Sequence, residues 1–197
     1  RETRKGIFVK YQTTDFRNGL KIAIDEKPYI VVNFAHVNPG KGSAFVKAKI
    51  KNLITGQVLE RTFKAGVDTV DKPDMEEREM EYTYGDMDGY NFMDTKTFES
   101  IHLSHETVED AKYYLQEGIK VDILYFNERP ISIDLPNFVS LKVTETDPGL
   151  KGDTATGGSK KAIMETGLQV NVPLFINEGE LLKIDTRTGE YVERVKS

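Results

Sequence analysis

Short apolar or alternating runs, broken by Gly, Pro, Asn or Asp roughly every eight to twelve residues, dominate this sequence. Such a pattern is typical of strands joined by tight turns, and it favours an all-β fold made of small barrels. Residues 44–52 show it most clearly, because three aliphatic residues there alternate strictly with three lysines. A period of two places the aliphatic side chains on the core face of a strand and the lysines on its solvent face.

Helical periodicity is clearest in one stretch, residues 106–116. There Val108, Ala111 and Leu115 fall on one face, and Gly118 stands where a helix C-cap is expected. One short helix among strands is typical of a small five-stranded barrel.

Composition divides the 197 residues into three parts. Residues 67–74 hold three Asp and one Pro without periodicity, so we expect a linker there and a second one at residues 135–137. The expected domains are therefore residues 1–66, 67–137 and 138–197. Each is small for an independent core, so we expect them to pack against one another.

Charge is distributed unevenly over these three parts. Residues 1–66 carry 13 Lys or Arg and 5 Asp or Glu, for a net charge of +8. Residues 67–137 carry 6 and 18, for −12, and residues 138–197 carry 8 and 9, for −1. This asymmetry is expected when one end of a protein approaches phosphate and another avoids it. The alternative is charge drift between unrelated solvated surfaces.

Several classes of protein are excluded by what the sequence lacks. The chain has no cysteine, which excludes a disulfide framework, thiolate zinc sites, iron–sulfur clusters and cysteine nucleophiles. No apolar run approaches the ~18 residues of a membrane helix. Residues 1–10 lack the apolar core of a signal peptide. We therefore expect a cytoplasmic protein with no membrane contact.

A narrow turn is predicted between two strands, residues 29–37 and 44–52. Pro39 cannot extend a strand ladder, and Gly40 and Gly42 admit positive φ, so the chain turns sharply with Lys41 at its tip. An isolated ammonium group on such a finger can enter a crevice that a broad surface cannot. The alternative, which geometry alone favours, is an ordinary solvated turn lysine.

The strand after this turn carries Lys47, Lys49 and Lys51 on its predicted solvent face. A row of ammonium groups along a strand suits contact with a phosphate backbone and lacks groups that read base edges. We therefore expect these three lysines to contact phosphate without sequence preference.

The remaining motifs predict no metal or nucleophilic site. His102 and His105 lack the metalloprotease pattern H-E-x-x-H, and no Ser/His/Asp order with a nucleophile elbow occurs. Residues 86–89 (Asp-Met-Asp-Gly) depart from a calcium loop in the position of the glycine and predict a hairpin turn instead. We expect no cofactor.

A long polar loop is predicted at residues 147–160, which include four glycines and two threonines. Its backbone amides and hydroxyls could contact sugar, phosphate or base edges. The alternative is a long solvated hairpin.

Three stretches with distinctive sequences follow one another along the chain: DFRNGL at residues 15–20, HVNPGKGSAF at 36–45, and a C-terminal run that reads DPGLKGDTATGG at 147–158, ETGLQVNVPLFINEGE at 165–180 and IDTRTGEYVERV at 184–195. In order and spacing, the chain from about residue 14 onward resembles bacterial elongation factor P. The resemblance implies an SH3-like (KOW-type) domain followed by two OB-fold barrels, in an L-shaped arrangement that mimics tRNA.

The resemblance also implies a function without a catalytic residue of the protein's own. Members of the family bind the 70S ribosome between the peptidyl and exit sites when peptide-bond formation stalls at consecutive prolines. The family's finger lysine, which matches Lys41, reaches the CCA end of the peptidyl-tRNA, prolyl-tRNA above all. In many members this lysine is modified after translation, which makes a lysine-modifying enzyme a further partner. We expect a monomer.

Two other family sites are carried over from the C-terminal run. The loop that contacts the exit-site mRNA codon matches Gly152, Asp153 and Thr154. The family's Tyr and Arg that face RNA match Tyr191 and Arg194.

Three alternatives stay open at the level of sequence. The first is the paralogous elongation-factor-P-like protein, which has the same shape and a different context preference. The second is an OB-type binder of single strands without sequence preference, against which the acidic middle part argues. The third is an enzyme that uses His102, His105 and nearby carboxylates.

Overall fold

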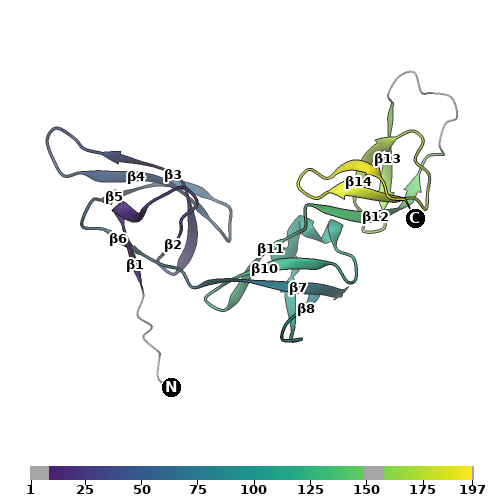
Figure 1. Ribbon diagram of the computed structural model, residues 1–197, viewed down its shortest axis with the longest axis horizontal. Coiled ribbons are helices and arrows are strands. Elements are labelled where there is room, and N and C mark those ends of the chain that lie inside the picture. Colours follow the sequence, from purple (N-terminus) through teal and green to yellow (C-terminus); the bar gives the residue numbers. More distant parts are fainter. Residues whose placement is uncertain (1–8, 149–157, 197) are drawn as a thin grey trace. The chain divides into compact units, whose positions relative to one another are not determined.

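The computed structural model describes residues 9–148 and 158–196 of the chain. These residues form three β-sheets, so the all-β prediction is confirmed (Figure 1). The chain divides into two compact units. One contains the described residues up to Glu76 together with Leu124–Ser132, and the other contains Glu77–Ile123 together with the residues from Ile133 onward.

The first sheet has six strands in the order β1-β6-β2-β3-β4-β5. Their bounds are β1 Lys10–Gln12, β2 Lys21–Ile24, β3 Lys27–Val37, β4 Phe45–Asn52, β5 Val58–Lys64 and β6 Thr69–Asp71, with a 3-10 turn η1 at Thr13–Asp15. The predicted alternation on β4 is confirmed: Val46, Ala48 and Ile50 are fully buried in the core of this sheet.

Strand β6 lies inside the segment that the sequence predicts as the first linker. It pairs with β1 through Tyr11 and Val70, and with β2 through Ala23 and Asp71. Val70 belongs to the buried core of the first sheet. The first sheet therefore extends beyond residue 66. The three residues of β6 are too short a run to show periodicity.

The middle sheet has the order β11-β10-β7-β8-β9. Its strands are β7 Met75–Gly85, β8 Gly89–Asp94, β9 Ser100–Ser104, β10 Lys120–Phe126 and β11 Arg129–Asp134. The predicted hairpin between β7 and β8 is confirmed, and Asp86 N donates to Gly89 O at 2.8 Å across its turn.

The prediction of one continuous helix over residues 106–116 is wrong. The structure has one α-helical turn, α1 (His105–Val108), followed by a 3-10 helix, η2 (Glu109–Tyr114). Glu109 has φ 49°, and this left-handed residue redirects the chain between the two segments. Val108, the last residue of α1, and Leu115, which directly follows η2, are nevertheless buried. No helix among the described residues is long and apolar enough to cross a membrane.

The C-terminal sheet has the order β14-β13-β12-β15-β16. Its strands are β12 Phe138–Thr146, β13 Ser159–Met164, β14 Gln169–Pro173, β15 Leu181–Asp185 and β16 Glu190–Arg194. Alternate residues on these strands form one buried cluster that includes Leu141, Val172 and Leu182. Most of the intervening residues are exposed or half-buried, as expected for a sheet with one solvated face.

Candidate nucleic-acid interface

The turn that joins β3 to β4 extends beyond the paired part of the first sheet (Figure 1), and Lys41 lies in this turn. The last pair of the ladder is Val37 with Phe45, and the residues between them make no strand. Lys41 is exposed in this turn, and within the described chain it makes no hydrogen bond or ion pair. Its ammonium group is therefore free to meet an external anion.

One of the two glycines around Lys41 adopts the conformation that the sequence predicts. Gly42 has φ 111°, a conformation that side chains other than glycine rarely adopt, whereas Gly40 has no positive φ. A Cβ added at Gly40 would meet nothing within 4 Å, and one added at Gly42 would meet only Pro39 Cγ, at 3.8 Å. The tip thus has open space around it.

The solvent face of β4 presents Lys47, Lys49 and Lys51, and all three are exposed. Lys47 Nζ lies 4.0 Å from Glu60 Oε1 on β5, with both side chains about half exposed (53% and 54%). A pair this exposed and this long contributes little to stability. In the described chain, Lys49 and Lys51 make no ion pair at all. The face therefore keeps most of its positive charge for a partner.

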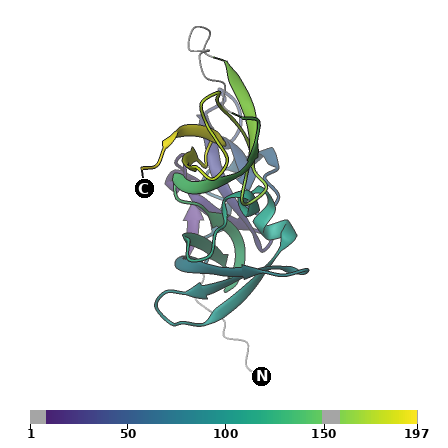
Figure 2. The same ribbon diagram turned by 90° about the vertical axis from the view of Figure 1, so that its right-hand side faces the viewer.

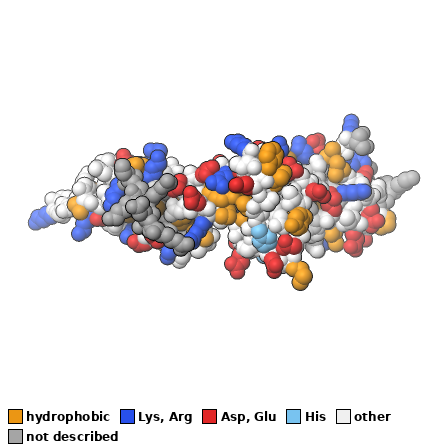
Figure 3. Space-filling view, turned by 90° about the horizontal axis from the view of Figure 1, so that it is seen from below, with side chains coloured by type: hydrophobic (Ala, Val, Ile, Leu, Met, Phe, Trp, Pro, Cys, Tyr) orange, Lys and Arg blue, Asp and Glu red, His pale blue; other side chains and the backbone are white. Residues whose placement is uncertain are grey.

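A space-filling view shows where charged side chains lie on one face of the molecule. Lys and Arg side chains are exposed at the end of the first unit where the β3–β4 hairpin lies (Figure 3). This agrees with the net charge of +8 counted for residues 1–66.

Two predicted RNA-facing residues lie on the last strand, β16. Arg194 is exposed, its Nη1 donates to Glu180 Oε1 at 3.1 Å, and its guanidinium carbon lies 5.0 Å from the centre of the Phe175 ring. Tyr191 is half-buried and packs against the C-terminal core, so only part of its ring is accessible. The third predicted group, Gly152, Asp153 and Thr154, lies outside the described residues.

The structure adds a cationic aromatic cluster that the sequence does not predict. Lys183 Nζ and Arg187 Cζ lie 4.7 and 5.4 Å from the centre of the exposed Phe138 ring. Arg187 also donates to both carboxylate oxygens of Asp185, and this contact lowers the pKa of Asp185. Neighbouring residues in the sequence do not indicate this cluster, because Phe138 comes to lie beside Asp185 only through the pairing of β12 with β15.

Three family profiles match successive parts of this chain. The elongation factor P KOW-like domain matches residues 12–69, the elongation factor P OB domain matches residues 75–133, and the elongation factor P C-terminal domain matches residues 139–194. The chain belongs to the elongation factor P family.

Individual members of this family are similar over nearly their whole length. The chain is 55% identical over 185 residues to elongation factor P of Bdellovibrio bacteriovorus, which covers 94% of this chain and 98% of the relative. It is 56% identical over 182 residues to elongation factor P of Moorella thermoacetica, with 92% and 98% covered. Elongation factor P being a translation factor, this chain is a translation elongation factor.

A solved structure shares part of the fold. Eukaryotic translation initiation factor 5A from Methanococcus jannaschii aligns with a TM-score of 0.52 at 19% identity, covering 65% of this chain and 93% of that chain. At this identity the likeness supports the architecture of the covered part only.

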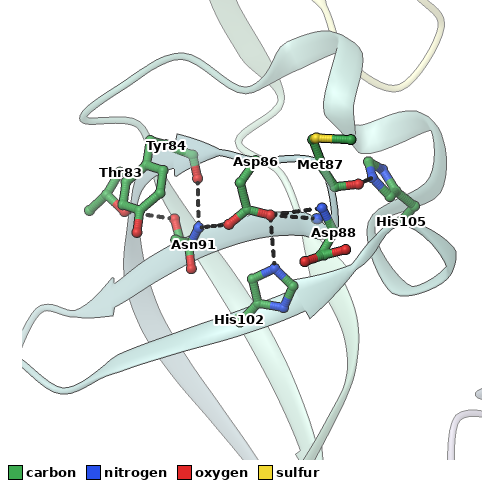
Figure 4. A network of polar contacts seen from close by, with 9 residues as sticks. Thr83, Tyr84, Asp86, Met87, Asp88, Asn91, His102 and His105 are labelled. Atoms are coloured by element: carbon green, nitrogen blue, oxygen red, sulfur yellow. Dashed lines mark hydrogen bonds and ion pairs between the residues drawn. The ribbon is translucent and has the colours of Figure 1, made fainter.

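His102 on β9 and His105 at the start of α1 each contact the turn that joins β7 to β8 (Figure 4). His102 Nε2 lies 3.3 Å from Asp86 Oδ1, whereas His105 Nε2 lies 3.1 Å from the carbonyl oxygen of Met87. The two rings therefore serve different partners. In the part of the chain that the structure describes, no group of three or more His, Cys, Asp or Glu side chains is arranged to hold a metal.

Asp86 is the centre of this network. Its carboxylate accepts from Asn91 Nδ2 at 2.9 Å and from the backbone amides of Asp88 and Gly89 at 2.9 and 3.0 Å. These bonds, that of Asn91 first, lower the pKa of Asp86 from 3.8 to about 2. Because the folded-state pKa is depressed, the stabilisation is present above pH 3.8 and is lost as pH falls through about 2.

We predict that Asn91→Ala raises the pKa of Asp86 towards its ordinary value, because the hydrogen bond with the largest effect is removed. Carboxyl NMR titration of the full chain measures this directly. Asp94 is the internal control, since the backbone amides of Thr97 and Lys96 lower its pKa and the substitution leaves them in place. An Asp86 that already titrates near 3.8 in the unchanged protein would contradict the network.

Proposed function

We propose that this elongation factor binds the 70S ribosome between the peptidyl and exit sites and stimulates peptide-bond formation at consecutive prolines. The observation that carries the proposal is the exposed Lys41 at the tip of a narrow hairpin, where it has no partner within the described chain. The family membership supports the ribosome as the partner.

The proposed activity requires positioning of the peptidyl-tRNA rather than acid–base catalysis. Proline attacks through a secondary amine, which is hindered and slow, so a stalled peptidyl-tRNA gains from being held in a productive orientation. Orientation of reacting groups can be worth up to about 7–11 kcal/mol. In this proposal Lys41 binds the CCA end of the prolyl peptidyl-tRNA by its ammonium group and fixes its position. No residue of the factor donates or accepts a proton.

The first unit supplies the affinity for tRNA in this proposal. Lys47, Lys49 and Lys51 follow one strand and face solvent, so they can contact successive phosphates of one backbone. The acidic residues 67–137 are repelled by phosphate and would face solvent or basic ribosomal proteins.

The C-terminal part supplies further RNA contacts in this proposal. We assign the exit-site codon to Gly152, Asp153 and Thr154 and a further RNA contact to Tyr191 and Arg194. The exposure of Arg194 supports its role. A lysine-modifying enzyme remains a proposed partner of Lys41, whose exposure makes it accessible.

The test is translation of a message with consecutive prolines in a system that lacks the factor. Added protein should relieve the pause at the prolines and leave a matched message without them unchanged. Equal stimulation of both messages, or relief at other sequences only, would contradict the proposal. Binding of free single-stranded RNA as tight as binding of ribosomes would favour the single-strand binder.

The lysine row makes a second prediction. Changing Lys47, Lys49 and Lys51 together to Gln should weaken ribosome binding, because three phosphate contacts are lost. The slope of log affinity against log salt should become shallower by about 2 to 3, since each neutralised phosphate adds about 0.7 to 0.9 to it. Filter binding over a range of salt concentrations measures the slope.

A matched triple variant removes the same charge elsewhere. Lys72, Lys96 and Lys120 are equally exposed and lie off the β4 face. Their change to Gln should leave the slope within error of the unchanged protein. Equal slopes for both triple variants would show that the lysines of β4 act only through net charge.

A further inference from the structure

The 3-10 helix η2 of the middle sheet lies beside the C-terminal sheet in two perpendicular views (Figures 1 and 2). Two separate turns of the C-terminal sheet contact it. One is the turn that joins β13 to β14, at residues 165–168, and the other joins β15 to β16, at residues 186–189. All of these residues belong to the same compact unit.

The first turn is held by two hydrogen bonds. Thr166 Oγ1 donates to the carbonyl oxygen of Tyr113, and Gln116 Nε2 donates to Glu165 Oε1. The Glu165 carboxylate is itself fixed, because it also accepts from the backbone amide of Lys142 at 2.8 Å. The acceptor is thus held in place by its own sheet.

The second turn receives the side chain of Tyr114. This side chain packs against the buried cluster of the C-terminal sheet. Its hydroxyl lies so close to the second turn that a Cβ added at Gly189 would be 3.1 Å from it. Burial raises the pKa of Tyr114, and the negative charges of Asp110 and Asp185 add to the shift.

From this two-point attachment we infer that Tyr114 is a positioning residue, which fixes the orientation of the C-terminal sheet relative to the middle sheet. A single contact would let one sheet rotate freely about it, whereas two contacts on separate turns leave only rotation about the line that joins them, and the packing of the Tyr114 ring against the C-terminal cluster opposes that rotation. Among the described residues of Glu77–Ile123, Tyr114 and Ile119 pack against the buried cluster of the C-terminal sheet. Tyr114 contributes more, because its ring is larger and its hydroxyl also lies beside the second turn.

The consequence for binding rests on the proposed function. A factor that must contact RNA with several of its parts binds more tightly when these parts are already oriented, because less orientational freedom is lost on binding. If only a fraction of molecules has the competent orientation, the apparent Kd rises by the inverse of that fraction. A joint that is open nine-tenths of the time would weaken binding about 10-fold.

The test compares Tyr114→Ala with Tyr84→Ala in the full chain. Tyr84 is also on the middle sheet, but 61% of it is exposed, so its truncation removes the same atoms without touching the joint. Residual dipolar couplings are recorded for the amides of residues 77–123 and of residues 138–148 and 158–194. In the unchanged protein and in Tyr84→Ala, one alignment tensor should fit both groups. Tyr114→Ala should require two different tensors.

Amide exchange at the buried Phe92 and Leu182 shows whether both sheets remain folded in the variant. If Tyr114→Ala loses either core, Tyr114→Leu replaces it, since it keeps an apolar side chain at this position and removes the ring and its hydroxyl. A single tensor for a folded Tyr114→Ala, or for Tyr114→Leu in its place, would overturn the inference. So would two tensors in the unchanged protein.

Ribosome binding gives a second readout that a purely structural role would not produce. Tyr114→Ala should raise the apparent Kd about 3-fold to 30-fold and reach the same extent of stimulation at saturation. If Tyr114→Ala required two alignment tensors but bound the ribosome with an unchanged Kd, the positioning role would be overturned. Failure of the unchanged protein to act at consecutive prolines would overturn the proposed function alone, because the dipolar couplings do not depend on the ribosome.

Discussion

Lys41→Ala should abolish most of the stimulation at consecutive prolines while leaving the fold intact. The side chain is exposed and without a partner in the described chain, so its truncation removes no packing or hydrogen bond. Surface substitutions of this kind change the free energy of unfolding by about 0.5 kcal/mol or less. The rate at a proline pause should nevertheless fall about 100-fold, because the loss of orientation at a reacting centre costs this much.

A polyproline reporter and a thermal melt test this together. The reporter should respond to Lys41→Ala as it does to omission of the factor, and the melting temperature should stay unchanged. Lys72→Ala is the control, since it removes another exposed lysine from the same unit. Retained reporter activity in Lys41→Ala would contradict the role assigned to this residue.

The double variant Asp153→Ala with Thr154→Ala should produce the second large effect, of a different kind. We assign these residues to the exit-site codon from the family resemblance. Loss of polar contacts to a bound partner acts mainly on dissociation, so the residence time on stalled ribosomes should shorten about 10-fold to 100-fold. The extent of stimulation should recover when more factor is added, because the finger is intact.

Residence times from single-molecule fluorescence measure this effect. Ser140→Ala with Glu145→Ala is a suitable control, since both residues are exposed on β12, which precedes this loop in the sequence. A double variant that keeps the full residence time, or that stimulates poorly even in excess, would contradict a role in binding alone.

Where a pattern is long and strict, the sequence predicts the structure of this chain. The alternation of residues 44–52 determines which side chains of β4 are buried and which face solvent, and the Pro and Gly residues around Lys41 locate the turn. The Asp-Gly pair of residues 88 and 89 likewise predicts the β7–β8 hairpin. Each of these three features depends on the conformational preferences of residues that are close together in the sequence.

The features that the sequence does not predict depend on contacts between distant segments. Strand β6 exists because β1 and β2 offer it partners, and its three residues alone show no periodicity. The left-handed Glu109 that divides α1 from η2 has no local signature, since Glu usually favours helix. The Tyr114 joint brings together turns that follow it by more than fifty residues, so no spacing in the sequence reveals it.

The claim that Lys41 orients the peptidyl end can be tested most directly by single-turnover peptide-bond formation on a proline-stalled ribosome. The rate is measured over a range of factor concentrations for the unchanged protein and for Lys41→Ala. We predict that both curves saturate and that the Lys41→Ala curve stays about 100-fold lower at any concentration, because the lost contribution is orientation rather than affinity. If Lys41→Ala reached the rate of the unchanged protein at saturation, Lys41 would contribute only to binding, and the claim would be wrong.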